Sequence, residues 1–282
     1  MDKQLIHQFI VNALSEDVGD GDHTSLATIE AGTQGKAKLL VKDTGILAGV
    51  ELAKEIFEVV DPNLQLEVFL NDGAEVKPKD IAFIVSGDAQ NILKAERLVL
   101  NCMQRMSGIA TKTNEIVDLL QGTNTKVLDT RKTTPGLRYL EKWAVRIGGG
   151  VNHRIGLYDM ILIKDNHVDY SGGIRQAIEN ANHYLEQTGK KLAIEIEVRN
   201  LDELEQVLQT GKVNRILLDN FDFDSLRQAV SMIEGRYITE ASGGITIDNI
   251  RDYADCGVDY VSVGALTHSV KSLDLSLKAV KL

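Results

Sequence analysis

Two glutamates lie two positions apart within a short apolar stretch, residues 193–198. They are Glu195 and Glu197, and in a strand such residues point to the same side. A strand inside a parallel sheet has no solvated face, and a buried carboxylate is costly unless a cation or a ligand compensates it. The pattern therefore predicts a functional role for at least one of the two glutamates.

The segment 131–164 is basic in an otherwise acidic chain. Seven Arg and Lys residues against two acidic ones give it a net charge of +5, while the whole chain carries −10. Guanidinium and ammonium groups bind carboxylates and phosphates, so we expect a basic mouth for a small, multiply charged anion. Of these cations we expect Lys142 on a helix surface, and the following at the mouth: Arg131, Lys132, Arg154 and Lys164.

Two glycine-rich turns follow late apolar stretches. Ser242-Gly243-Gly244 precedes a helix that we expect near Thr246, and Val263-Gly264-Ala265 follows the last apolar stretch. Backbone N–H groups in such turns bind phosphates, although each turn can equally be a plain tight turn. Gly148-Gly149-Gly150 ends a helix and predicts a flexible or closely packed loop.

From residue 126 onward, short apolar stretches alternate with helical ones. Strands are expected at 126–129, 160–163, 193–198, 216–218, 237–240 and 258–263, and helices at 136–147, 174–187, 201–209, 225–234 and 247–255. This alternation predicts parallel βαβ units. Six units favour an incomplete α/β barrel, with an open doubly wound sheet as the alternative. In a parallel barrel the polar ends of the strands meet at one mouth.

The first third of the chain predicts a small α+β, sandwich-like domain. An amphipathic helix opens it, strands are expected at 37–41, 64–70 and 81–85, and a helix at 51–60. A helix at 91–107 should stop at Gly108 before a second one at 111–120. We therefore expect an N-terminal α+β domain over 1–108, to which the tail 270–282 returns, and an open α/β barrel over 109–269.

Composition excludes several classes of protein. The acidic balance disfavours nucleic acid and anionic membranes as partners, and no apolar run approaches the length of a membrane span. The two cysteines, Cys102 and Cys256, have no metal-type or disulfide spacing. This usage fits a reducing cytoplasm.

Several runs together resemble one enzyme family over essentially the whole chain. They are EDVGDGD (16–22), AER (95–97), SGIAT (107–111), DTRKTTPGLR (129–138), GGGVNHR (148–154), IKDNH (163–167), LLDN (217–220), SGGI (242–245) and VGALTHS (263–269). In this order they are similar to the signatures of quinolinate phosphoribosyltransferase, a type II phosphoribosyltransferase.

The resemblance implies an N-terminal α+β domain, a seven-stranded type of open α/β barrel, and a homodimer in which one subunit covers the barrel mouth of the other. It implies a reaction of quinolinate with phosphoribosyl pyrophosphate in the presence of Mg²⁺. The products would be nicotinate mononucleotide, pyrophosphate and CO₂, on the route to NAD. Catalysis would involve Lys132, Glu197 and Asp219, the last two also holding the metal. Substrate binding would further involve Arg97 from the partner subunit, Thr130, Arg131, His153, Arg154, Lys164, Ser242, Gly243, Gly244, Val263, Gly264 and Ala265.

Two rival functions fit the same residues. A related transferase acting on nicotinate or another base would need fewer cations, because its substrate has one carboxylate less. A non-catalytic phosphosugar-binding barrel would use the cations and glutamates only as ligand contacts. The decarboxylating transfer itself requires no covalent nucleophile on the protein.

Overall fold

A computed structural model describes residues 3–280 of the protein. Residues 1–2 and 281–282, which the expected domain and tail include, lie outside the described residues. The chain forms two compact units. The first, called the N-terminal unit, comprises the described residues up to Asn114, residues 134–149 and those from Ser269 onward; the second, called the barrel unit, comprises 115–133 and 150–268.

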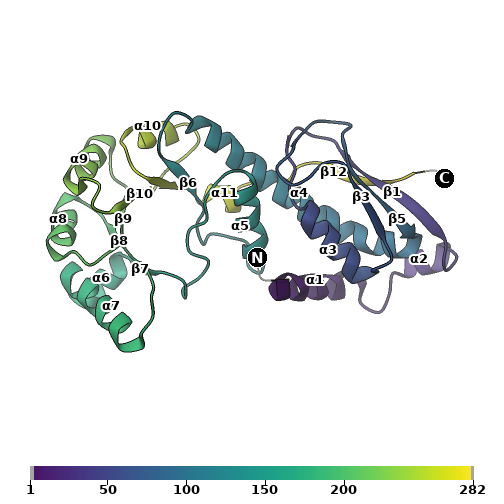
Figure 1. Cartoon of the computed structure of the whole chain (residues 1–282), viewed down its shortest axis with the longest axis horizontal. Helices are drawn as coiled ribbons and strands as arrows, with labels where there is room; N and C mark the ends of the chain where they lie inside the picture. Colours follow the sequence, from purple (N-terminus) through teal and green to yellow (C-terminus); the bar gives the residue numbers. More distant parts are fainter. Residues whose placement is uncertain (1–2, 281–282) are drawn as a thin grey trace. The chain divides into compact units, whose positions relative to one another are not determined.

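The N-terminal unit is built on an antiparallel sheet. Within the described residues this sheet has the strand order β12-β1-β5-β3, and a separate pair joins β2 and β4 (Figure 1). Buried residues alternate with more exposed ones along β1, as expected for a sheet with one face on a core. Its elements are α1 (Lys3–Val18), α2 (His23–Thr28), β1 (Gln34–Val41), β2 (Gly45–Ile46), α3 (Val50–Val60), β3 (Gln65–Val68), β4 (Glu75–Val76), β5 (Ile81–Asp88), α4 (Ala89–Leu119), α5 (Arg138–Ile147) and β12 (Leu275–Ala279).

The helix α4 corrects one prediction. We expected Gly108 to stop a helix, but α4 runs through it. A Cβ at Gly108 would lie 2.3 Å from the backbone oxygen of Lys271, so the glycine lets the tail cross the helix at close range. Gln104 fixes the same crossing, because its backbone oxygen accepts from the N–H of Leu273 at 3.0 Å.

The tail continues into β12, which pairs antiparallel with β1, Leu39 lying opposite Leu277. It thus completes the sheet of the N-terminal unit.

The helix α5 differs from expectation in its place and its burial. The alternation assigned it to the first crossover of the barrel, but it belongs to the N-terminal unit. Lys142, expected on the helix surface, is 1% exposed, and its neighbour Glu141 is fully buried. Arg105 on α4 pairs with Glu141 at 2.9 Å. Charged residues of α5 that a surface helix would expose to solvent are therefore buried inside the N-terminal unit.

The barrel unit contains one parallel sheet. Its described strands follow the order β6-β11-β10-β9-β8-β7, and all of its pairings are parallel. Where the resemblance implies a seventh strand, the described chain has a single bridge between Leu128 and Val151. The strands are β6 (Lys126–Leu128), β7 (Ile161–Ile163), β8 (Ile194–Val198), β9 (Arg215–Asp219), β10 (Ile238–Ser242) and β11 (Tyr260–Ser262). Since β6 and β7 form the two edges of this order, the barrel is open.

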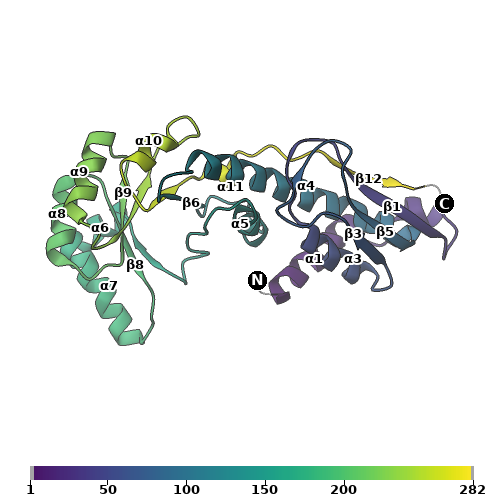
Figure 2. The same cartoon turned by 45° about the horizontal axis from the view of Figure 1, so that its top comes forward.

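The helices of the barrel unit lie largely on the outer side of this sheet, apart from the short α11, which follows β11 (Figures 1 and 2). They are α6 (Asp165–Ser171), α7 (Ile174–Thr188), α8 (Leu201–Thr210), α9 (Phe223–Ile233), α10 (Ile250–Asp255) and α11 (Ala265–His268). Local sequence sets where two of them begin, because Asn200 accepts from the N–H of Glu203 at the start of α8 and Asp222 from that of Ser225 at the start of α9. The sequence therefore predicted these two helices to within two residues.

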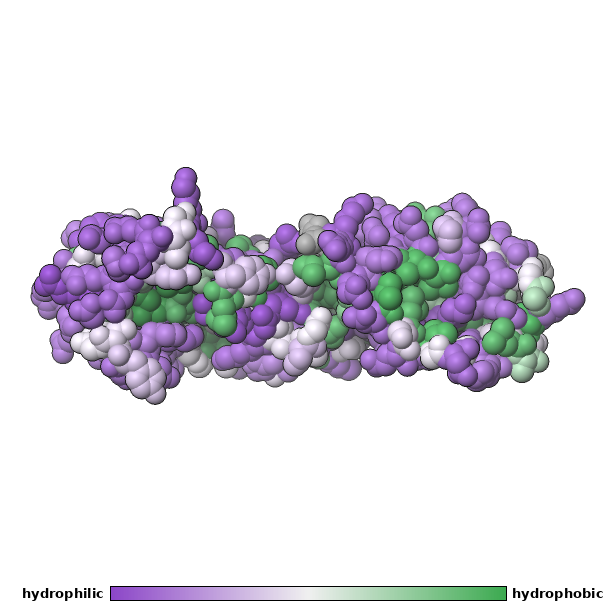
Figure 3. Space-filling view, turned by 90° about the horizontal axis from the view of Figure 1, so that it is seen from below, coloured by the Kyte–Doolittle hydropathy of each residue, from purple (hydrophilic) through white to green (hydrophobic). Residues whose placement is uncertain are grey.

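No helix among residues 3–280 is long and apolar enough to span a membrane. The surface of the N-terminal unit, on the right in Figure 3, nevertheless shows apolar side chains between polar ones. Leu5 and Val11 on α1 are 42% and 40% exposed. A cavity of about 500 Å³ also lies in this unit, and apolar residues of α1 and of the segment 135–140 line it.

Candidate functional site

A pocket of about 340 Å³ opens among the carboxyl ends of the barrel strands. Chain segments that follow β6 and β7, and the ends of β10 and β11, supply its polar walls. Its lining residues are Asp129, Thr130, Arg131, Lys132, His153, Arg154, Leu162, Lys164, Leu217, Glu240, Ser242 and Ser262. The four cations expected at the mouth, Arg131, Lys132, Arg154 and Lys164, all belong to this set. The pocket is thus an electropositive cavity of a size suited to a small anion.

Short loops hold two of these cations in place. The Lys132 N–H donates to Thr130 Oγ1 at 3.0 Å, and Thr267 Oγ1 donates to the Lys132 backbone oxygen at 2.8 Å. Gly264 also adjoins Lys132, because a Cβ there would lie 3.0 Å from its Cδ. Arg154 is 8% exposed, and its Nη1 donates to the Met160 backbone oxygen at 3.2 Å. Burial, with the charge of Arg131, lowers the pKa of Arg154.

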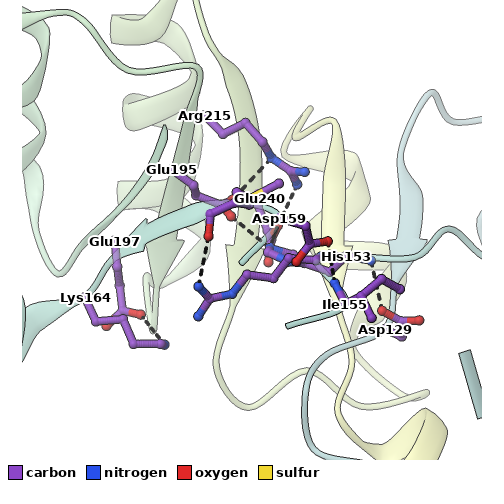
Figure 4. Close-up of polar contacts among 11 residues, drawn as sticks. Asp129, His153, Ile155, Asp159, Lys164, Glu195, Glu197, Arg215 and Glu240 are labelled. Carbon is purple, nitrogen blue, oxygen red and sulfur yellow. Dashed lines mark hydrogen bonds and ion pairs between the residues drawn. The ribbon is translucent and has the colours of Figure 1, made fainter. Parts of the chain in front are cut away.

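The two glutamates of β8 have different partners, although they share a side of the strand. Glu197 pairs with Lys164, whose Nζ lies 3.0 Å from Glu197 Oε2 (Figure 4). Glu195 lies deeper and is fully buried. Both therefore have cations beside them, as their burial requires. Asp219, at the end of the neighbouring strand β9, is half-buried and accepts from Asn220 Nδ2 at 2.6 Å.

Glu195 belongs to a buried charge cluster at the base of the pocket, which we define as His153, Glu195, Arg215 and Glu240 (Figure 4). His153 Nε2 lies 2.8 Å from Glu195 Oε2 and 3.4 Å from Glu240 Oε2. Arg215 Nη2 lies 2.7 Å from Glu240 Oε2, and Arg215 Nε 3.3 Å from Glu195 Oε1. These Glu195 contacts lack the alignment of hydrogen bonds, so charge attraction holds Glu195 in the described structure.

The cluster shifts the pKa values of its members. Burial alone would lower the pKa of His153, but its contacts with Glu195 and Glu240 raise it to about 9. Burial likewise opposes ionisation of Glu195, yet His153 and Arg215 hold the pKa of Glu195 below its usual range. Burial raises the pKa of Glu240, and the charge of Glu195 adds to this rise.

Two aspartates shape the chain around His153. Asp129 Oδ1 accepts from the His153 N–H at 2.9 Å, and Asp129 Oδ2 accepts from Asn152 Nδ2 at 2.5 Å. Asp159 accepts from the N–H groups of Ile155 and Gly156 at 2.7 and 2.9 Å. Since Asp129 is fully buried at the end of β6, it fixes the backbone that carries His153.

The glycine turn after β10 differs from expectation. The helix expected from residue 247 begins only at Ile250 and has six residues, so a helix start does not directly follow Gly244. Asn249 closes the turn instead: its Oδ1 accepts from the Thr246 N–H at 2.8 Å and its Nδ2 donates to the Gly244 oxygen at 3.1 Å. Gly243 has a φ of +94°, and a Cβ there would clash with Asn220. The conformation of the turn therefore requires a glycine at position 243.

The predicted site residues are distributed as follows. Those that line the pocket are Thr130, Arg131, Lys132, His153, Arg154, Lys164 and Ser242. Glu197 contacts Lys164, and Gly264 contacts Lys132. Asp219 lies opposite the lining residue Ser242 in the register of β9 and β10. Gly243 and Val263 directly follow the lining residues Ser242 and Ser262, and Gly244 and Ala265 come shortly after them. Arg97 is exposed on α4, in the N-terminal unit.

Sequence reasoning missed three members of this region: Asp129, Arg215 and Glu240. Asp129 and Glu240 stood at expected strand ends that meet at one mouth, but neither was assigned a role of its own. A usable signal for Arg215 was present, because two same-side buried glutamates require cations and Arg215 begins the next strand. Its side chain also lies over the Tyr260 ring, 5.0 Å from the centroid.

Comparison with known proteins covers both parts of the chain. Residues 22–107 match the family model described as quinolinate phosphoribosyl transferase, N-terminal domain, and residues 109–278 match that of the C-terminal domain. A quinolinate phosphoribosyltransferase [decarboxylating] from Nicotiana glauca is 48% identical over 94% of this chain and 80% of its own length. A probable nicotinate-nucleotide pyrophosphorylase [carboxylating] from Bacillus subtilis is 42% identical over 98% and 92%.

The fold agrees with solved structures. The nicotinate-nucleotide pyrophosphorylase from Francisella tularensis superposes with a TM-score of 0.92 at 38% identity, over 99% of this chain and 98% of the other. A similarity of this extent covers both units and the strand ends that build the pocket.

Proposed function

This chain belongs to the quinolinate phosphoribosyltransferase family, and we propose that it transfers the phosphoribosyl group of phosphoribosyl pyrophosphate to quinolinate with decarboxylation. The products are nicotinate mononucleotide, pyrophosphate and CO₂, and the nucleotide serves NAD biosynthesis. One observation carries the proposal: Arg131, Lys132, Arg154 and Lys164 line a single pocket of about 340 Å³ in a chain whose net charge is −10.

The charges of the substrates fit this pocket. Quinolinate carries two carboxylates, and phosphoribosyl pyrophosphate carries a phosphate and a pyrophosphate. Arg131 and Arg154 offer planar guanidinium forks for carboxylates or phosphates, while Lys132 and Lys164 act as point charges. Most of the rate acceleration then comes from positioning two anions side by side and from stabilising the departing pyrophosphate.

The reaction itself needs no covalent step on the protein. The ring nitrogen of quinolinate attacks the anomeric carbon as the pyrophosphate leaves, through a sugar that carries positive charge. Carboxylates near the ribose stabilise this charge, and Glu197 and Asp219 occupy suitable strand positions. Lys132 lines the pocket, and its role in this proposal is to stabilise the leaving pyrophosphate. As the 2-carboxylate departs as CO₂, the electrons of its bond stay on the ring carbon beside the new pyridinium nitrogen, and that carbon then takes up a proton from water.

The donors near the pocket suit Mg²⁺. This ion is usually held by one or two carboxylates together with substrate phosphates and water. Asp219 is half-buried at a strand end, and Glu197 contacts Lys164 through Oε2. We propose that these two residues hold Mg²⁺, directly or through water, where the ion would neutralise charge on the pyrophosphate.

We further propose that the enzyme works as a homodimer, in which Arg97 of one subunit reaches the barrel mouth of the other. Arg97 is exposed and lies in the N-terminal unit, outside the lining of the pocket. The exposed apolar residues Leu5 and Val11 on α1 give this unit surface that a partner subunit can bury.

Substrate exchange tests the proposed reaction against its rivals. With phosphoribosyl pyrophosphate and Mg²⁺, we expect pyrophosphate release with quinolinate and none above background with nicotinate. Turnover of nicotinate alone would establish the related transferase. Tight binding of both anionic substrates without any product would establish the non-catalytic barrel.

A further inference from the structure

The backbone of Lys132 is held at both of its polar groups, although Lys132 lies in a loop. Its N–H donates to Thr130 Oγ1 at 3.0 Å, and its oxygen accepts from Thr267 Oγ1 at 2.8 Å. Lys132 Nζ, by contrast, has no hydrogen bond or ion pair among residues 3–280, whereas Lys164 Nζ is paired with Glu197 at 3.0 Å. Lys132 is therefore fixed at its backbone and available to a ligand at its charge.

The hydroxyl of Thr267 joins two segments that leave neighbouring strands. Thr267 belongs to α11, shortly after β11, and its side chain is fully buried. Its Oγ1 donates to the Gly264 oxygen at 3.2 Å as well as to the Lys132 oxygen, so both oxygens share one hydroxyl hydrogen. Since β11 pairs with β6, with Ser262 opposite Leu128, this hydroxyl ties the loop after β6 to the turn after β11.

The same turn also adjoins the side chain of Lys132. A Cβ at Gly264 would lie 3.0 Å from Lys132 Cδ and 3.3 Å from the ring of His268. The aliphatic part of Lys132 therefore passes close to the turn, where a larger residue than glycine would displace it. The segment 264–267 thus contacts Lys132 twice, at the backbone and along the side chain, and so restricts where its ammonium group lies.

We propose that Thr267 is a positioning residue, whose hydroxyl holds the Lys132 backbone so that the ammonium group meets the leaving pyrophosphate. This inference rests on the proposed function, because that function gives Lys132 the leaving group. Thr267 itself is fully buried and lies outside the lining of the pocket, so it acts through Lys132. A misplacement of about 1 Å in a reacting group costs up to about a hundredfold in rate.

The barrel unit supplies a matched control at the other end of the same two strands. Thr125, 6% exposed, directly precedes β6, and its Oγ1 donates to the Val258 oxygen at 2.6 Å shortly before β11. Thr125→Val therefore removes a buried hydroxyl that joins the same neighbours at their amino ends, outside the lining of the pocket. It should cost as much stability as Thr267→Val without affecting Lys132.

Steady-state kinetics of the full-length protein test the role of the hydroxyl. Thr267→Val keeps the shape and should lower kcat by about thirtyfold with KM for quinolinate changed by less than about twofold, because the lost contact acts on the leaving group. Thr267→Ser keeps the hydroxyl and should retain about half of kcat or more. Thr125→Val should lower the melting temperature as much as Thr267→Val and leave kcat at the wild-type value. Equal losses of kcat in Thr125→Val and Thr267→Val would overturn the proposal.

A double-mutant cycle with Lys132→Ala shows whether Thr267 acts through Lys132. Once the ammonium group is gone, its position no longer matters, so Thr267→Val should change the residual kcat of Lys132→Ala by less than about twofold. A purely structural role would lower kcat by the same factor in both backgrounds, and that result would contradict the positioning role. If Thr267→Val does not fold, Thr267→Ala, with Thr125→Ala as its control, takes its place in the cycle.

Calorimetry with pyrophosphate and Mg²⁺ separates this inference from the proposed function, because it needs no turnover. Thr267→Val and Lys132→Ala should each weaken pyrophosphate binding by about tenfold, and the double variant no further. If the wild-type protein does not turn over quinolinate, the proposed reaction fails, yet the binding cycle still decides the role of Thr267. If turnover is normal and the two losses multiply, the reaction stands and the positioning role is wrong. A wild-type protein that neither turns over quinolinate nor binds pyrophosphate would overturn both.

Discussion

At the scale of single residues, the pocket contains two kinds of charged side chain: cations that are exposed to solvent and a cluster of charges that is buried. Arg131 and Lys132 are exposed, so ligands can reach their side chains. The cluster of His153, Glu195, Arg215 and Glu240 has the opposite character. This contrast gives the two groups different responses to substitution and to pH.

The exposed cations should matter for turnover and not for folding. We expect Arg131→Ala and Lys132→Ala each to lower kcat/KM by about a hundredfold or more, because each removes a charged contact to an anionic substrate. The melting temperature should change by no more than about 2 °C, as for other exposed positions. Kinetics and thermal unfolding of the same preparations measure both effects. Loss of the folded state in both variants would show a structural role.

The buried cluster should make stability depend on pH. In the folded protein Glu195 and Glu240 raise the pKa of His153 to about 9, against the opposing effect of burial, whereas a histidine in the unfolded chain loses its proton near pH 6.5. The stabilisation is therefore complete below pH 6.5 and is lost as the pH rises toward 9, by about 3 kcal/mol. Urea unfolding of wild type and His153→Asn at both pH values isolates this contribution. A difference between the two proteins that stays constant with pH would contradict it.

At the scale of elements, the sequence predicted the parallel strands well and the helix boundaries less well. β8 could be predicted because its apolar and acidic residues alternate, and α8 and α9 because Asn200 and Asp222 cap them. The continuity of α4 could not be predicted. It depends on the tail, which crosses Gly108 more than 160 residues later in the chain, and tertiary contacts of this kind override local propensity.

Gly108 offers a test at this scale. Alanine normally stabilises a helix relative to glycine by about 1 kcal/mol. At Gly108 the added Cβ would meet the Lys271 oxygen at 2.3 Å, so we expect Gly108→Ala to destabilise the protein by about 2 kcal/mol. Asn101→Ala, at an exposed position of α4, should be neutral or slightly stabilising. A stabilised Gly108→Ala would mean that the tail does not cross here.

The candidate site was only partly predictable for a related reason. Polar residues at the ends of parallel strands indicated a common mouth, and the four cations expected there line one pocket. Arg215 and Glu240 could not be placed beside His153 from the sequence, because their proximity depends on the register of β8, β9 and β10. The start of α10 was wrong because Asn249 closes the preceding turn with side-chain hydrogen bonds.

At the scale of the whole molecule, the central question is whether each active site draws on two subunits. Mixing Arg97→Ala with Lys132→Ala tests this, since a mixed dimer would contain one site with both residues intact. After subunit exchange we expect about a quarter of wild-type activity, because half of randomly formed dimers are mixed and each has one working site. No recovery in a verified mixed dimer would place Arg97 outside the partner's site.

At this scale the molecule is acidic as a whole, with one basic segment. The total of −10 disfavours large polyanions as partners, while the +5 of residues 131–164 is concentrated partly at one pocket. Small anions are therefore attracted to a single place on an acidic protein. The compartment inferred from the two cysteines stays a prediction; both are free and buried in the structure.

The most direct test of the proposed reaction follows the carbon that leaves. Quinolinate labelled with ¹³C in its 2-carboxylate is incubated with the enzyme, Mg²⁺ and phosphoribosyl pyrophosphate, and quinolinate labelled in its 3-carboxylate serves as the matched control. We predict labelled CO₂ from the first substrate only, in equal amount to pyrophosphate, and none when phosphoribosyl pyrophosphate is omitted. Pyrophosphate release without labelled CO₂, or CO₂ release without phosphoribosyl pyrophosphate, would contradict the proposed function.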